Sequence, residues 1–96
     1  MPSYVLSPAA QSSLRHIKSW SSKQFGTAAT TEYLGRLRQK MQSLAKHPYS
    51  GRERPDVKAG YYSAFVGSHT VYYRLADQGI EIIDVLHQSM EPQPHL

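Results

Sequence analysis

The stretch GSHTVYYRLADQGIEIIDVLHQSM, residues 67–90, decides the fold. It contains two runs rich in β-branched and aromatic residues, 69–75 and 80–87, separated by the turn-forming residues 76–79. A third run of the same kind, 61–66, ends at Gly67-Ser68, which suits a two-residue hairpin loop. The sequence therefore predicts three consecutive antiparallel strands.

The pairing of these strands follows from their turns if both hairpins are regular. Val66 then faces His69, Leu75 faces Ile80, and Arg74 faces Glu81. Because side chains alternate along a strand, the sheet has two faces. A bulge would move some of the residues from one face to the other. The apolar face, expected under the helices, holds Ala64, Val66, Val71, Tyr73, Leu75, Ile80, Ile82 and Leu86. The mixed face, expected to be partly open, holds Tyr61, Phe65, Tyr72, Arg74, Glu81, Ile83, Val85 and His87.

A short strand and two amphipathic helices are expected before these strands. Residues 3–6 are β-prone, and Ser7-Pro8 is a good helix start. Gly26 separates the first helix from the second, which His47-Pro48 ends. Trp20 and Met41 lie on or beside the apolar stripes and are expected in the core.

These elements predict an α+β fold of order β-α-α-β-β-β, a helical hairpin packed on a mainly antiparallel sheet. Residues 1–87 form a single domain, residues 49–60 a loop, and residues 88–96 a loosely held C-terminal tail. A chain of 96 residues has room for one core only.

The composition favours a soluble protein in the cytoplasm. A hydrophobic content of 40% and a charged content of 19% argue against disorder, and no stretch is long and apolar enough to span a membrane. The absence of cysteine excludes disulfides and thiolate metal sites. A net charge of +4 permits an acidic partner, either a protein segment or nucleic acid.

Three groups of side chains are candidates for function, and each also has a structural interpretation. Arg74, Glu81 and His87 could act on RNA as phosphate binder and proton-transfer groups, or form a cross-strand ion pair beside a strand-end histidine. Arg52 and Arg54 could bind phosphate or an acidic segment, or contact Asp56 in a solvated loop. The third group is aromatic and could stack on bases or simply pack: Tyr61, Tyr62, Phe65, Tyr72 and Tyr73.

No cofactor or metal is expected. The five histidines, His16, His47, His69, His87 and His95, have no spacing typical of zinc sites. The chain also contains neither a nucleophile elbow nor a glycine-rich phosphate loop.

Several motifs occur in an order that resembles the ParE branch of the RelE/ParE toxin superfamily. They include Tyr4-Val5-Leu6-Ser7-Pro8, Phe25-Gly26 and Leu44-Ala45-Lys46-His47-Pro48. Gly67-Ser68-His69, Tyr73-Arg74 and Leu86-His87-Gln88-Ser89-Met90 complete the likeness. The resemblance implies a toxin of a toxin–antitoxin pair that poisons DNA gyrase without chemistry of its own and is neutralised by a ParD-like antitoxin. No sequence-specific nucleic-acid binding is expected.

The resemblance also suggests residues for two surfaces. The surface expected to bind the target combines the tail with basic side chains: Arg52, Arg54, Arg74, His87, Gln88, Ser89 and Met90. The surface expected to bind the antitoxin is apolar and aromatic: Leu34, Leu37, Met41, Tyr61, Phe65 and Tyr72. One alternative is a RelE-like ribosome-dependent mRNA endonuclease, although Tyr62 stands where the superfamily often has arginine and the tail has no tyrosine. Another is an inactive homologue that only binds antitoxin.

Overall fold

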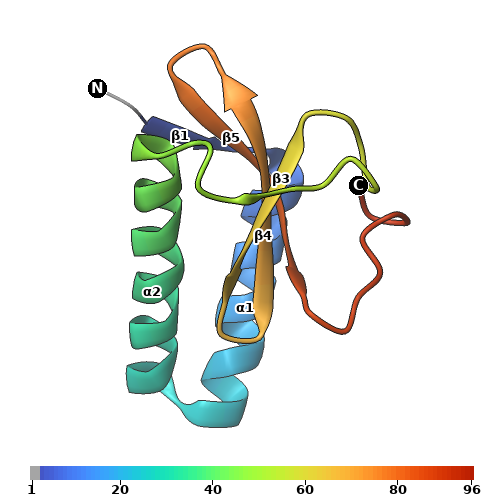
Figure 1. Cartoon of the computed structure of the whole chain (residues 1–96). Coiled ribbons are helices and arrows are strands. Elements are labelled where there is room, and N and C mark those ends of the chain that lie inside the picture. The colour runs from blue at the N-terminus through green and yellow to red at the C-terminus, as the bar shows by residue number, and fades with distance from the viewer. Residues whose placement is uncertain (1–2) are drawn as a thin grey trace.

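In the computed structural model, which describes residues 3–96, two helices lie against one face of a five-stranded sheet (Figure 1). The elements run β1 (Ser3–Leu6), α1 (Pro8–Phe25), α2 (Thr27–Lys46), β2 (Arg52–Glu53), β3 (Tyr61–Val66), β4 (His69–Ala76) and β5 (Gly79–His87). The strand order is β1-β5-β4-β3-β2, with β1 parallel to β5 and the other pairs antiparallel. The predicted α+β arrangement is confirmed.

The helical hairpin begins and turns where the sequence predicts. The hydroxyl of Ser7 accepts the Ala10 N–H at 3.0 Å, and Pro8 occupies the first turn, where its missing N–H leaves no donor unpaired. Gly26 links the two helices with φ +87°, a conformation that side-chain-bearing residues rarely adopt. These local features set where each helix begins and where α1 ends.

The core lies between the helices and the inner face of the sheet. Leu37, Met41 and Leu44 of α2 are at most 2% exposed, and Tyr73, Ile80 and Ile82 oppose them from the strands. The prediction that Met41 belongs to the core is therefore confirmed. Burying side chains of this size contributes roughly 1.5–3 kcal/mol each, which makes this layer the main source of stability.

The predicted register holds for both hairpins near their turns. Val66 pairs with His69, Arg74 with Glu81, and Leu75 with Ile80. A bulge then shifts the pairing of β4 with β5 between Tyr72 and Tyr73, which leaves Ile83 as the extra residue.

This bulge makes part of the predicted face assignment wrong. Because side chains alternate, inserting Ile83 exchanges the faces of every β5 residue that follows. Val85 joins the core cluster under the helices, and His87 pairs with the inner-face residue His69. Leu86, predicted under the helices, instead pairs with Thr70 on the outer face, the side of the sheet that faces away from the helices.

Two of the predicted loops are shorter than expected. Within the expected loop 49–60, Arg52 and Glu53 form a two-residue strand that pairs with Ser63 and Tyr62. The turn between β4 and β5 is reduced to two residues, because Ala76 and Gly79 still pair. Backbone pairing thus continues to the ends of both hairpins.

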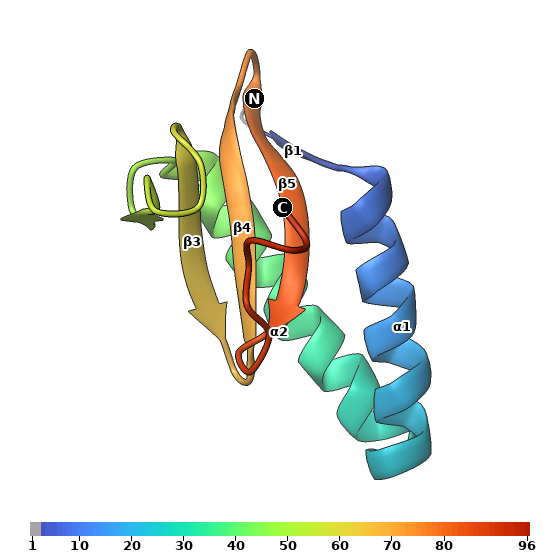
Figure 2. The ribbon, with the colours of Figure 1, turned by 90° about the vertical axis from the view of Figure 1, so that its right-hand side faces the viewer.

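Trp20 is not a core residue. Its side chain is 47% exposed and packs edge-to-face on Phe25, with ring centroids 5.8 Å apart. Figure 2 shows the physical reason, since the C-terminal end of α1 extends past the ends of the strands. Trp20 lies near that end, at the edge of a cleft where the ends of the strands cover it only in part.

The C-terminal segment, residues 88–96, is tied to the β3–β4 turn at its first residue and contains local turns. The Gln88 N–H donates to the Ser68 carbonyl at 2.8 Å, and the Leu96 N–H donates to the Pro92 carbonyl at 2.9 Å. Both views place this segment on the outer face, alongside β4 and β5 and opposite α2 (Figures 1 and 2). Leu86 and Tyr72 are 4% exposed but lie outside the core cluster under the helices.

Candidate functional site

A groove of about 300 Å³, here called the helix groove, lies between α1, α2 and β1. Its apolar lining comes from all three elements, and three cations stand among these residues. The lining residues are Tyr4, Leu6, Leu14, Arg15, Lys18, Leu34, Leu37, Arg38 and Met41. The structure thus brings together half of the predicted antitoxin surface, with Leu37 and Met41 as a nearly inaccessible floor.

The helices carry most of the positive charge of the chain. Seven of its eleven Lys and Arg residues but only one of its seven acidic residues lie between Pro8 and Lys46. Arg15, Lys18 and Arg38, which stand at the helix groove, are all exposed. The total charge alone does not point to these three residues, whereas the uneven distribution of charge along the chain does.

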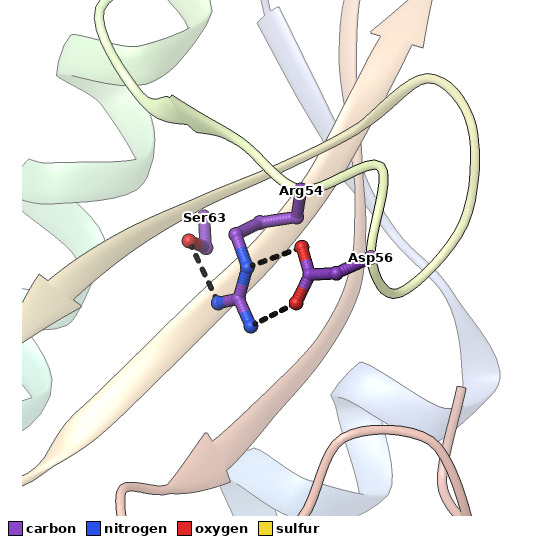
Figure 3. A network of polar contacts seen from close by, with 3 residues as sticks. All are labelled: Arg54, Asp56 and Ser63. Carbon is purple, nitrogen blue, oxygen red and sulfur yellow. Dashed lines mark hydrogen bonds and ion pairs between the residues drawn. The ribbon is translucent and has the colours of Figure 1, made fainter.

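The outer face carries Arg54, whose guanidinium is held by three hydrogen bonds (Figure 3). Both oxygens of the Asp56 carboxylate accept hydrogen bonds from Arg54, each at 3.1 Å. A third Arg54 N–H donates to the Ser63 hydroxyl at 3.3 Å. The guanidinium lies over the Tyr72 ring, 5.5 Å from its centroid. The hydrogen bonds from Arg54 lower the pKa of Asp56, and the same bonds raise the pKa of Arg54. The predicted contact of the loop arginines with Asp56 is confirmed for Arg54.

Tyr73 holds the loop that carries Arg54. Its hydroxyl donates to the Pro48 carbonyl at 2.8 Å and accepts the Gly51 N–H at 3.0 Å. A Cβ on Gly51 would come within 2.2 Å of that hydroxyl, so only glycine permits this approach. Burial raises the pKa of Tyr73, which keeps its hydroxyl protonated and able to donate.

The other predicted residues of the outer face differ in their contacts and in their exposure to solvent. Arg74 forms the predicted cross-strand pair with Glu81, with Nε and Oε1 2.6 Å apart. Phe65 is 66% exposed, whereas Tyr72 is buried beneath Arg54. The antitoxin candidates Tyr61, Phe65 and Tyr72 therefore lie on the opposite side of the sheet from those in the helix groove.

His87 lies at the end of β5, at a cleft of about 460 Å³ beside α1. Three histidines, His16, His69 and His87, line this cleft together with Trp20 and Met90. Burial, followed by the charge of His87, lowers the pKa of His69. The predicted target residues are thus divided, with Arg54 and Arg74 on the outer face and His87 at the cleft.

Residues 3–96 contain no group of three or more histidine or acidic side chains placed to hold a metal ion. Within the same range, neither helix combines the length and the apolar character needed to cross a bilayer.

The sequence model of the family described as "ParE toxin of type II toxin-antitoxin system, parDE" matches residues 4–92. The chain belongs to the ParE toxin family. The protein named Toxin ParE1 from Caulobacter vibrioides is 36% identical over 96 residues, which cover 100% of this chain and 99% of the relative. Toxin ParE1 from Mycobacterium tuberculosis is 35% identical over 94 residues, covering 97% and 96%. The resemblance inferred from the ordered motifs is therefore confirmed.

A solved structure described as the chromosomal ParDE TA system from P. aeruginosa has the same fold. It superimposes with a TM-score of 0.77 and covers 91% of this chain and 96% of that chain. Sequence identity is 16%, so this likeness bears on the architecture alone.

Proposed function

We propose that this ParE family member is a toxin that inhibits DNA gyrase by protein–protein binding and is neutralised by a ParD-like antitoxin in the cytoplasm. The observation that carries the proposal is the family match over residues 4–92 together with relatives of the same length named as toxins. The arrangement of the outer face and of the helix groove supports a binding protein with two separate surfaces.

The helix groove is the proposed site for the antitoxin. Its apolar floor suits the apolar side of a helix or extended segment, and the cations at its rim suit carboxylates on that partner. Arg15, Lys18 and Arg38 attract such a segment and fix its direction, because charge complementarity acts mainly on association rate and specificity. The antitoxin segment is therefore expected to be acidic and amphipathic.

The outer face and the C-terminal segment are the proposed gyrase contact. Arg74 is exposed there, and Arg54 is held by Asp56 and Ser63. An arginine that is already positioned loses little side-chain entropy on binding, which favours its use as a contact. The aromatic ring of Phe65 adds an exposed apolar contact on the same face.

The geometry of the outer face supports binding over RNA cleavage. A general base must lie within hydrogen-bond reach of the proton that it removes. The bulge removes His87 from this face, and the carboxylates of Asp56 and Glu81 are engaged by Arg54 and Arg74. Within strands β2 to β5, the outer face thus has arginines for phosphate but no histidine to move a proton.

A gyrase assay with the purified protein tests the proposal. The expected result is loss of supercoiling together with accumulation of linear DNA after protein removal. Cleavage of ribosome-bound mRNA with gyrase unaffected would overturn it in favour of a RelE-like endonuclease. Normal growth of cells that express soluble protein without antitoxin would instead identify an inactive homologue.

Charge reversal at the helix groove tests the antitoxin surface separately. Arg38→Glu is expected to weaken antitoxin binding at least tenfold, because it removes a favourable charge and adds a repulsive one. Lys23→Glu is the matched control, since Lys23 is exposed on α1 but does not line the groove. Equal effects of the two substitutions would show that only total charge matters.

A further inference from the structure

The C-terminal segment begins with a turn that closes on the ring of His87. The Ser89 N–H points to His87 Nδ1 at 3.1 Å, and the Ser89 hydroxyl lies 2.7 Å from the same nitrogen. The Met90 N–H donates to the His87 carbonyl at 2.9 Å, which completes the turn. Both the ring and the carbonyl of His87 therefore hold the first residues of the segment.

A backbone N–H can only donate, so this geometry requires that His87 Nδ1 carry no proton. The ring is then neutral, with its proton on Nε2. Protonation would place a second donor against the Ser89 N–H and abolish that bond. The Ser89 hydroxyl can rotate to accept instead, but the backbone amide cannot.

His87 is exposed to solvent, and its side-chain neighbours are ring side chains rather than carboxylates. His69 on β4 is its cross-strand partner, with ring centroids 5.4 Å apart, and His16 faces the same cleft from α1. From α2, the Tyr33 hydroxyl lies 2.6 Å from His69 Nδ1. The nearest carboxylate on β5, Asp84, is already engaged by the Ser13 hydroxyl and the Val85 N–H.

Glu91, the acidic side chain of the segment, does not supply a negative charge beside His87. Within residues 3–96, Glu91 takes part in no ion pair. The residues that line the cleft likewise include no Asp or Glu. A charged His87 would thus meet one neighbouring histidine directly and no carboxylate.

We propose that His87 is a proton-operated latch at the root of the C-terminal segment, closed when the imidazole is neutral and opened when it is protonated. Opening frees the Ser89 amide, which is one of the two backbone donors that close the turn onto His87. Two backbone bonds remain after opening, from the Gln88 N–H to the Ser68 carbonyl and from the Met90 N–H to the His87 carbonyl, and neither involves the imidazole ring.

Nuclear magnetic resonance of the full-length protein tests the latch directly. At pH 8, long-range ¹H–¹⁵N spectra are expected to show His87 with its proton on Nε2. As the pH falls to 5, the solvent exchange of the Ser89 amide, corrected for the intrinsic rate at each pH, is expected to rise about fivefold, the equivalent of one ordinary hydrogen bond. A proton on Nδ1 at pH 8 would overturn the proposal.

Two variants separate the latch from other titrations. In His87→Asn the amide oxygen replaces Nδ1 as an acceptor that does not titrate, so the Ser89 amide is expected to stay protected from pH 8 to 5. In His16→Gln the response of the wild-type protein is expected to persist. Identical pH responses in the wild-type protein and His87→Asn would overturn the proposal. Because every readout is made on the isolated protein, failure here leaves the proposed gyrase target unaffected.

Discussion

Tyr73→Phe tests how the structure positions the loop that carries Arg54. The ring of Tyr73 is fully buried in the core, and phenylalanine keeps it. The substitution removes only the hydroxyl that joins the Pro48 carbonyl to the Gly51 N–H. Its effect therefore isolates two hydrogen bonds at the base of the loop.

The expected change in the free energy of unfolding follows from the two backbone groups that lose their hydrogen-bond partner. A net hydrogen bond contributes about 1 kcal/mol, and a fully buried group that loses its partner costs about 1–3 kcal/mol. Pro48 and Gly51 are only partly buried, so water replaces part of the loss. The free energy of unfolding is expected to fall by about 2 kcal/mol.

Urea unfolding at neutral pH measures this change, with an unchanged slope as the sign that the fold is retained. Tyr49→Phe is the matched control, because Tyr49 is 74% exposed and its change is expected to stay within about 0.5 kcal/mol. Hydrogen exchange should also show faster opening of the Gly51 amide in Tyr73→Phe alone. Equal stability of the two variants would refute the role assigned to the Tyr73 hydroxyl.

Three further predictions concern the tail, the β3–β4 turn and pH. Deletion of residues 88–96 is expected to abolish gyrase inhibition while antitoxin affinity stays within about twofold, because the helix groove lies elsewhere; loss of both in a folded protein would contradict this separation. Gly67→Ala is expected to lower the free energy of unfolding by about 2 kcal/mol, because φ is +55° and the new Cβ would lie 2.6 Å from the Tyr33 ring. Gly35→Ala, in a helix with open space around the new Cβ, should raise the free energy of unfolding by up to about 1 kcal/mol. Urea unfolding of both variants measures the difference. Burial lowers the pKa of His69 below its usual 6.5, so the unfolded chain binds the proton more readily than the folded protein does. The free energy of unfolding should therefore decline as the pH drops below 6.5, and it should decline less in His69→Asn. A stability that stays constant from pH 8 to 5 would contradict the burial of a neutral imidazole.

Features set by neighbouring residues were predictable from the sequence. Ser7-Pro8 and Gly26 determine where the helices begin and turn, because capping and left-handed geometry are local requirements. The two-residue turn at Gly67-Ser68 fixed the first hairpin register, and the Arg74–Glu81 pair followed from the register of the second.

Features that depend on contacts far along the chain were not predictable in the same way. Ile82 and Ile83 are both apolar, so the alternation of β5 gives no sign of which one is the bulge. That single residue moves His87 to the inner side of the sheet and brings it beside His69. The exposure of Trp20 depends on how far α1 extends past the sheet, which periodicity alone does not determine.

Titration of the toxin against a fixed concentration of gyrase and DNA distinguishes inhibition by binding from enzymatic turnover, since a protein that acts by binding must act in stoichiometric amounts. If the toxin acts by binding, gyrase-linked DNA breaks are expected to increase in proportion to added toxin and to reach a plateau near one toxin per toxin-binding site. Antitoxin added in equal amount should abolish the effect. Complete loss of supercoiling at a small fraction of that ratio, growing with time, would show turnover and contradict inhibition by binding.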